Sequence, residues 1–151
     1  MQQSAICAAC RRPLLAERSI GAMEYPTQVA RHFSSPANVG PLEPGAGRVC
    51  RGEAGAAERG TWVVFEAQID AGRIRRLAFR AYGCPYVIAA CSRITELLTD
   101  TAVCSLLDFA PAALAAELDL PTEKSGSLLI IQDALRNCFR DWDTTPPAAA
   151  R

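Results

Sequence analysis

Two stretches in the middle of the chain have the residue pattern of β-strands. Residues 61–69 are rich in β-branched and aromatic residues, and apolar residues alternate with charged ones over residues 74–82. Between them, Asp70-Ala71-Gly72 is suited to a tight turn, because glycine accepts a positive φ at little cost. The pattern predicts an antiparallel hairpin, and residues 49–51 are predicted to add a short third strand.

Helical periodicity flanks this hairpin. Apolar residues recur at helical spacing over residues 25–33 and again from Pro85 to Leu98. Residues 106–118 are rich in alanine and leucine, but an internal proline is expected to split them into two pieces. The clearest amphipathic stripe runs over residues 127–142. Strands followed by helices predict an α+β fold, in which a small antiparallel three-stranded sheet is covered by helices on one face.

The pattern divides the chain into three parts. Residues 1–22 have little periodicity and precede Met23, a plausible start, so we expect an N-terminal extension that is disordered or results from a start assigned too early. Residues 23–143 are predicted to form one domain. Residues 144–151 are rich in proline and alanine and are predicted to be a disordered tail.

Charge and hydropathy exclude several function classes. Sixteen basic residues balance sixteen acidic ones, so there is no basic excess of the kind that nucleic-acid binding requires. No apolar stretch approaches the roughly 20 residues that a membrane span needs. The early apolar run is too short for a secretory signal. We therefore expect a cytoplasmic protein whose seven cysteines are free thiols.

The segment Phe79 to Pro85 carries the candidate chemistry. It places Cys84 at the end of a predicted strand and the start of a predicted helix. The first turn of a helix has free N–H groups and a partial positive charge, which favour a thiolate over a thiol. A metal site or a sulfur-transfer site needs a thiolate, although a lone cysteine there is also compatible with simple packing.

Several motifs occur in the order found in one known family. They are Tyr25…Val29…His32-Phe33…Pro36…Asn38-Val39-Gly40, then Phe79…Tyr82-Gly83-Cys84, then Ile94-Thr95-Glu96, Glu117-Leu118-Asp119-Leu120-Pro121 and Asp133-Ala134-Leu135. Over residues 25–142 the chain resembles the NifU/IscU family of iron–sulfur cluster assembly scaffolds, and the resemblance implies a SufE/NifU-like fold.

The resemblance also locates the ligand positions. The family holds its cluster with three cysteines and a nearby aspartate or histidine, and the central cysteine corresponds to Cys84. Glu58 stands where the first cysteine would be, and Gly60 where the aspartate would be. Gly126-Ser127 replaces the pair of histidine and third cysteine, while the lysine before that pair is kept as Lys124. Iron–sulfur clusters prefer thiolates, so glutamate and serine are poor replacements.

Three functions follow as alternatives. The first is a scaffold or carrier, not an enzyme, that binds a 2Fe-2S cluster or a single iron or zinc ion through Cys84 and Glu58. The resemblance implies a cysteine desulfurase as sulfur donor, an Hsp70-type chaperone recognising residues 120–124, and a homodimer as one option. The second is a partner-binding protein that has lost its cluster. The third is a thiol redox enzyme that uses Cys84 with Cys91.

The other cysteines are assigned by position. Cys50, on the short strand before the Glu58 loop, is a further candidate ligand, because it could approach Cys84 in space. Cys104 and Cys138 lie at helical core spacing and are predicted to be structural. Cys7 and Cys10 form a CxxC pair without the second pair of ligands that a zinc site requires.

Overall fold

The computed structural model describes residues 24–145, and they contain one antiparallel sheet. Its strands are β1 (Arg48–Ala56), β2 (Thr61–Asp70) and β3 (Arg73–Tyr82), in the order β1-β2-β3. The predicted hairpin is confirmed: β2 pairs with β3 across a turn in which Gly72 has a φ of 73°. The third strand was predicted too short, since β1 pairs with β2 along its whole length.

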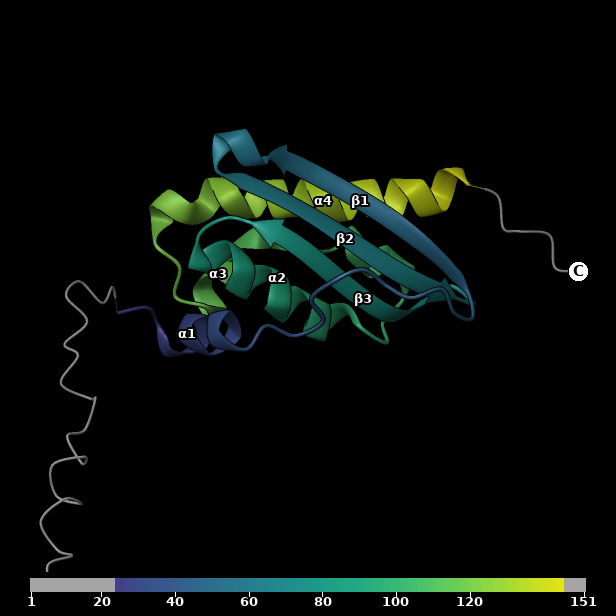
Figure 1. Ribbon diagram of the computed structural model, residues 1–151, viewed down its shortest axis with the longest axis horizontal. Coiled ribbons are helices and arrows are strands. Elements are labelled where there is room, and N and C mark those ends of the chain that lie inside the picture. Colours follow the sequence, from purple (N-terminus) through teal and green to yellow (C-terminus); the bar gives the residue numbers. More distant parts are fainter. Residues whose placement is uncertain (1–23, 146–151) are drawn as a thin grey trace, which may run out of the picture.

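Four α-helices and three short 3-10 helices complete the described chain (Figure 1). They are α1 (Thr27–Ser34), α2 (Pro85–Leu98), α3 (Pro111–Glu117), α4 (Ser125–Thr144), η2 (Ala57–Arg59), η3 (Val103–Leu106) and η4 (Thr122–Lys124). Proline starts both α2 and α3, because its fixed φ and missing N–H suit the first helical turn. None of the described helices is both long enough and apolar enough to cross a bilayer.

Helices cover one face of the sheet, as Figure 1 shows for α4 behind β1 and β2. The α4 helix packs on β1 and β2, and α2 packs on β3, so that Phe65, Leu77 and Ile131 lie in one core. The remaining helices form an outer layer, with α1 on α2 and α3 on α4. The expectation of helices on one face of the sheet is met by α2 and α4, which form the layer on the sheet, while α3 packs mainly on α4.

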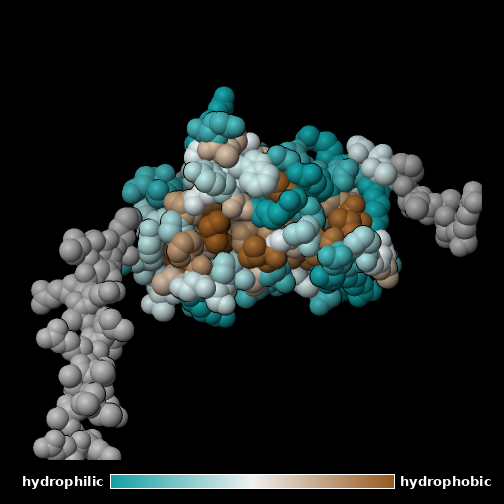
Figure 2. All heavy atoms as spheres, viewed as in Figure 1, coloured by the Kyte–Doolittle hydropathy of each residue, from teal (hydrophilic) through white to brown (hydrophobic). Residues whose placement is uncertain are grey.

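Residues 36–47, here called the strap, run across the other face of the sheet (Figure 1). The strap starts at the outer edge of β3, where Val39 forms a parallel bridge with Phe79. It then crosses β2: Leu42 N–H donates to Glu66 Oε2 at 2.9 Å, and a Gln68 amide donates to Ala46 O at 2.6 Å. In this view hydrophobic patches lie among hydrophilic residues (Figure 2).

The structure describes one of the two predicted domain boundaries, the C-terminal one. Helix α4 continues to Thr144, which places the start of the predicted tail inside the helix. The predicted extension over residues 1–22 and the Cys7/Cys10 pair lie outside the described residues.

Candidate functional site

Cys84 is the N-cap residue of α2, as the sequence predicts. Its C=O accepts a hydrogen bond from Val87 N–H at 2.9 Å, and its partly exposed side chain makes no capping bond. The preceding Gly83 lets the strand turn sharply into the helix, because a Cβ at that position would lie 3.0 Å from Val87 Cβ. The sequence Gly-Cys-Pro thus holds a thiol at the first turn of a helix and at the protein surface.

The loop containing Glu58 lies at the same end of the sheet as Cys84. The register pairs Trp62 at the start of β2 with Tyr82 at the end of β3, so the β1–β2 connection and the β3–α2 junction share one sheet end. Glu58 lies on η2 in that connection and is exposed. Gly60 follows with a φ of 87°, a conformation that glycine adopts readily.

The start of α4 lies beside the start of α2. Lys124, the last residue before α4, places its Nζ 5.9 Å from the centre of the Tyr86 ring, a cation–π contact. Tyr86 follows Cys84 closely in α2 and also packs edge-on against Tyr25, with ring centres 5.2 Å apart. The start of α4 therefore lies beside the start of α2, and the Glu58 loop lies at the same end of the sheet. These are the segments in which the sequence pattern placed Cys84, Glu58 and Lys124.

The donor atoms at this end do not form a metal site within one chain. Among residues 24–145, no three His, Cys, Asp or Glu side chains are close enough together to hold a metal ion. Around Cys84 the other candidate positions offer an exposed carboxylate on Glu58, an ammonium on Lys124 and a hydroxyl on Ser127. An iron–sulfur cluster requires thiolates or imidazoles at most of its ligand positions, so these residues do not fit a cluster held by a single chain.

Cys50 is not brought to Cys84. In the sheet it pairs with Ala67, which pairs with Leu77, five residues before Tyr82 on β3. Its side chain is fully buried, and burial raises the pKa of its thiol despite the opposing effect of Arg48. The Cys138 thiol of α4 lies 3.6 Å from Cys50 O. The expectation that Cys50 approaches Cys84 is therefore not met, because the strand register places it well along the sheet.

The remaining described cysteines divide by burial. Cys138 is buried, as predicted, and burial raises the pKa of its thiol to about 12. Cys91 is also fully buried, with the pKa of its thiol raised by burial alone, so it is poorly placed to resolve a disulfide with Cys84. Cys104 was predicted to be structural, and this is wrong: it is exposed, because the 3-10 geometry of η3 buries Val103 and Leu106 instead.

A buried polar network that the sequence pattern did not reveal joins α1, α2 and the strap. His32 Nδ1 lies 2.9 Å from Ser92 Oγ, which also accepts a hydrogen bond from Ala37 N–H at 2.8 Å. Asn38 donates to Thr95 Oγ1 at 3.1 Å. Ser92 and Thr95 are fully buried in an otherwise apolar helix. Two polar residues on the core face of that helix were the sequence signal that could have revealed the network.

Comparisons with known proteins identify the family to which the chain belongs. The family model of the NifU-like N-terminal domain matches residues 24–148. The chain belongs to the NifU-like N-terminal domain family. It is 30% identical over 121 residues to the iron–sulfur cluster assembly scaffold protein IscU of Haemophilus influenzae, covering 80% of this chain and 96% of that protein.

Two further relatives agree. The mitochondrial iron sulfur cluster assembly protein 2 of Saccharomyces cerevisiae is 28% identical over 122 residues, covering 80% of this chain and 78% of that protein. A crystal structure of a NifU-like N-terminal domain from Brucella abortus superimposes with a TM-score of 0.57 at 14% identity, covering 79% of this chain and 94% of that chain. At this low identity the structural match supports the α+β fold and nothing further.

Proposed function

We propose that this protein takes part in iron–sulfur cluster assembly as a scaffold or carrier, and that Cys84 is its working thiol. One observation carries the proposal: in a chain of the NifU-like family, Cys84 is a partly exposed cysteine at the N-terminus of α2, beside the start of α4. The names of the relatives support the assembly role. In this proposal the protein accepts sulfur, iron or a cluster and passes it on, and it does not turn over a substrate by itself.

The simplest step at this site is sulfur transfer. The Cys84 thiolate attacks the outer sulfur of a persulfide on a cysteine desulfurase. The bond between the two sulfurs of the donor breaks, the donor leaves as a thiolate, and a persulfide forms on Cys84. Electrons balance without an external oxidant. Lys124 lies near the start of α2 through its contact with Tyr86 and adds a positive charge to this end of the protein.

A cluster or iron ion would be cargo at this site and would need ligands from outside the chain. Cys84 supplies one thiolate, and Glu58 supplies a carboxylate that iron accepts less readily. We infer that any 2Fe-2S cluster is labile or is shared, either between two chains that each contribute Cys84 or with a partner's thiols. The lack of a grouped donor set among the described residues also favours a second candidate, a partner-binding protein without a cluster.

Anaerobic reconstitution with iron and sulfide tests the proposal. Visible absorption that appears on reconstitution and is lost in Cys84→Ala supports a cluster on Cys84. A persulfide on Cys84 without absorption supports sulfur transfer alone. If neither appears, the partner-binding candidate is the better account.

The partners and the location remain predictions. A cysteine desulfurase is the proposed sulfur donor. Residues 120–124 are the proposed contact for an Hsp70-type chaperone, and they lie where α3 ends and η4 leads into α4. A cytoplasmic location is proposed from the sequence.

A further inference from the structure

The outer edge of β3 has a gap in its backbone hydrogen bonding at Leu77. Residues of an edge strand alternate between bonding the neighbouring strand and facing outward. Phe79 faces outward, because its N–H donates to Asn38 O at 3.0 Å and its C=O accepts from Gly40 N–H at 3.0 Å. Leu77 lies two residues before Phe79 on the same regular part of β3, so its N–H and C=O face the same edge.

The chain segments beside this edge turn away before they reach Leu77. The strap turns away from β3 at Asn38, whose φ is 54°, and the preceding Ala37 N–H donates to Ser92 Oγ of α2. On the other side, the chain after α2 bonds to Ile74, whose N–H donates to Thr101 O at 2.8 Å. No residue in the described part of the chain bonds to the outward N–H and C=O of Leu77.

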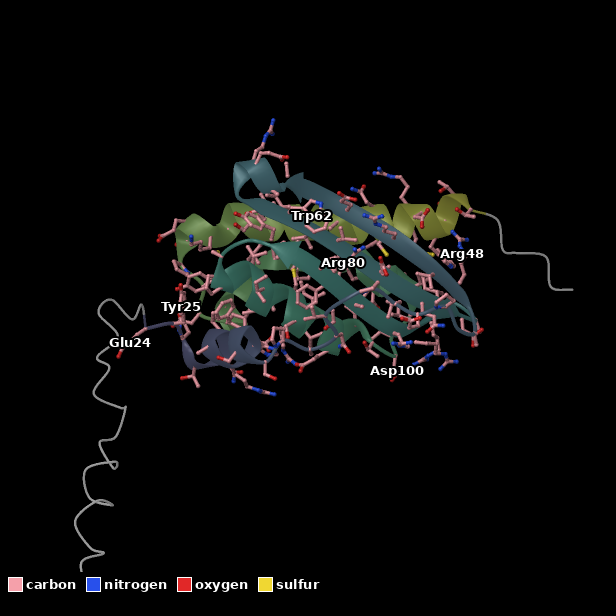
Figure 3. All side chains as sticks on the ribbon, in the orientation of Figure 1. Glu24, Tyr25, Arg48, Trp62, Arg80 and Asp100 are labelled. Carbon is pink, nitrogen blue, oxygen red and sulfur yellow. The ribbon has the colours of Figure 1, made fainter. Side chains whose placement is uncertain are left out.

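A cavity of about 390 Å³ opens at this gap. One wall is apolar and comes from the strap, where Val39 is 60% exposed beside Pro41 and Leu42. The opposite wall is basic and comes from Arg75 and Arg76 of β3. The chain that follows α2 closes the other end of the gap. There Asp100 N–H donates to Ile74 O, and Asp100 lies beside β3 in Figure 3.

The charges in the cavity favour an anion. Arg75 has only a loose, exposed pair with Asp70 at 3.8 Å, and within residues 24–145 no carboxylate pairs with Arg76. Glu96 also lines the cavity, but Arg93 holds its carboxylate at 3.3 Å. The basic wall is therefore available to a carboxylate from outside.

We propose that this gap binds the C-terminal carboxylate of a peptide. Leu77 N–H donates to the carboxylate, and Leu77 C=O accepts from the N–H of the last peptide residue. Arg76 pairs with the negative charge, and the last side chain packs against Val39 and Leu42. A chain end is favoured over a continuous segment, because a strand rises about 3.3 Å per residue and would soon meet the bonded segments on either side.

Titration of the ¹⁵N-labelled full chain with the peptide acetyl-Gly-Ser-Gly-Thr-Val tests this inference. The peptide with a free C-terminus is expected to shift the Leu77 amide resonance, and the same peptide with a C-terminal carboxamide is expected to bind at least about tenfold more weakly. Arg76→Gln is expected to weaken binding by a similar factor. Arg136→Gln is the control, since it removes one exposed arginine charge on α4, which does not line the cavity.

The inference is overturned if the carboxamide binds as tightly as the free acid, or if Arg76→Gln leaves the affinity unchanged. It is equally overturned if the Leu77 amide does not shift at saturating peptide. N-acetylvaline is a further arm: binding as tight as that of the peptide would assign the cavity to a small carboxylic acid and would reject a peptide ligand. The carboxamide arm requires no protein variant, so it does not depend on how a variant folds.

Discussion

Gly52 of β1 lies directly against the backbone of Cys138 in α4. A Cβ added at Gly52 would lie 2.6 Å from the Cys138 Cα and closer still to the backbone oxygen of Ala134. Helix α4 therefore sits on β1 at a distance that only glycine permits, and this contact fixes the height of the helix above the sheet.

Gly52→Ala is expected to lower the free energy of unfolding by about 3 kcal/mol, because the helix backbone must move away from the core. Gly126→Ala is the matched control: the Cβ would meet nothing within 4 Å, and alanine in a helix is favoured over glycine by up to about 1 kcal/mol. Urea denaturation of the two variants measures both. Equal stabilities would contradict the close packing of α4 on β1.

The contact between Gly52 and Cys138 was not evident from the sequence, although the hairpin and the position of Cys84 were. Asp70-Ala71-Gly72 and Gly83-Cys84-Pro85 specify their turns locally, so the hairpin and the position of Cys84 could be predicted. The strand register is a long-range property, and for that reason Cys50 was expected near Cys84 and is found elsewhere.

Two other features could not be predicted from local sequence patterns. Cys104 was assigned to the core on helical spacing, but the segment forms a 3-10 helix with a different buried face. The crossing of the strap over the second sheet face depends on hydrogen bonds between distant residues, such as Leu42 and Glu66, which no local pattern encodes.

His32 makes the stability of the domain sensitive to acid. Burial lowers its pKa below 6.5 more strongly than Glu96 raises it, while Arg31 and Arg93 lower it further and Glu117 opposes them. The unfolded chain therefore binds a proton before the folded one does, so stability is full above about pH 6.5 and decreases as the pH falls toward the folded pKa.

Denaturation midpoints measured between about pH 7 and pH 5 check this prediction. The wild-type protein is expected to lose stability over that range. His32→Gln is expected to have a smaller pH dependence there, whatever its stability at neutral pH. An identical pH slope in the two proteins would show that His32 is not the group responsible.

Restoring the missing ligands should convert the site into a stable cluster site. The variant Glu58→Cys, Gly60→Asp, Ser127→Cys places two more thiols and a carboxylate on segments at the Cys84 end of the sheet. After anaerobic reconstitution, this variant is expected to hold visible absorption through gel filtration, whereas the wild-type protein is expected to lose most of it. Equal retention by both would mean that the native residues already form a complete site.

Burial separates the thiols by their accessibility. Cys50, Cys91 and Cys138 are fully buried, so iodoacetamide is expected to modify them only after unfolding. Cys84 and Cys104 are expected to be modified in the native protein. Peptide mapping by mass spectrometry identifies each site, and early modification of a buried cysteine would contradict the packing of the core.

The central claim is that Cys84 is the thiol that receives sulfur. Incubation with a cysteine desulfurase and ³⁵S-labelled cysteine, followed by mapping of persulfides, tests it most directly. The control is Cys104→Ser, which removes the other accessible thiol of the described chain. The account predicts label on Cys84 that persists in Cys104→Ser and disappears in Cys84→Ser. Label on Cys104, Cys7 or Cys10 with an unmodified Cys84 would contradict it.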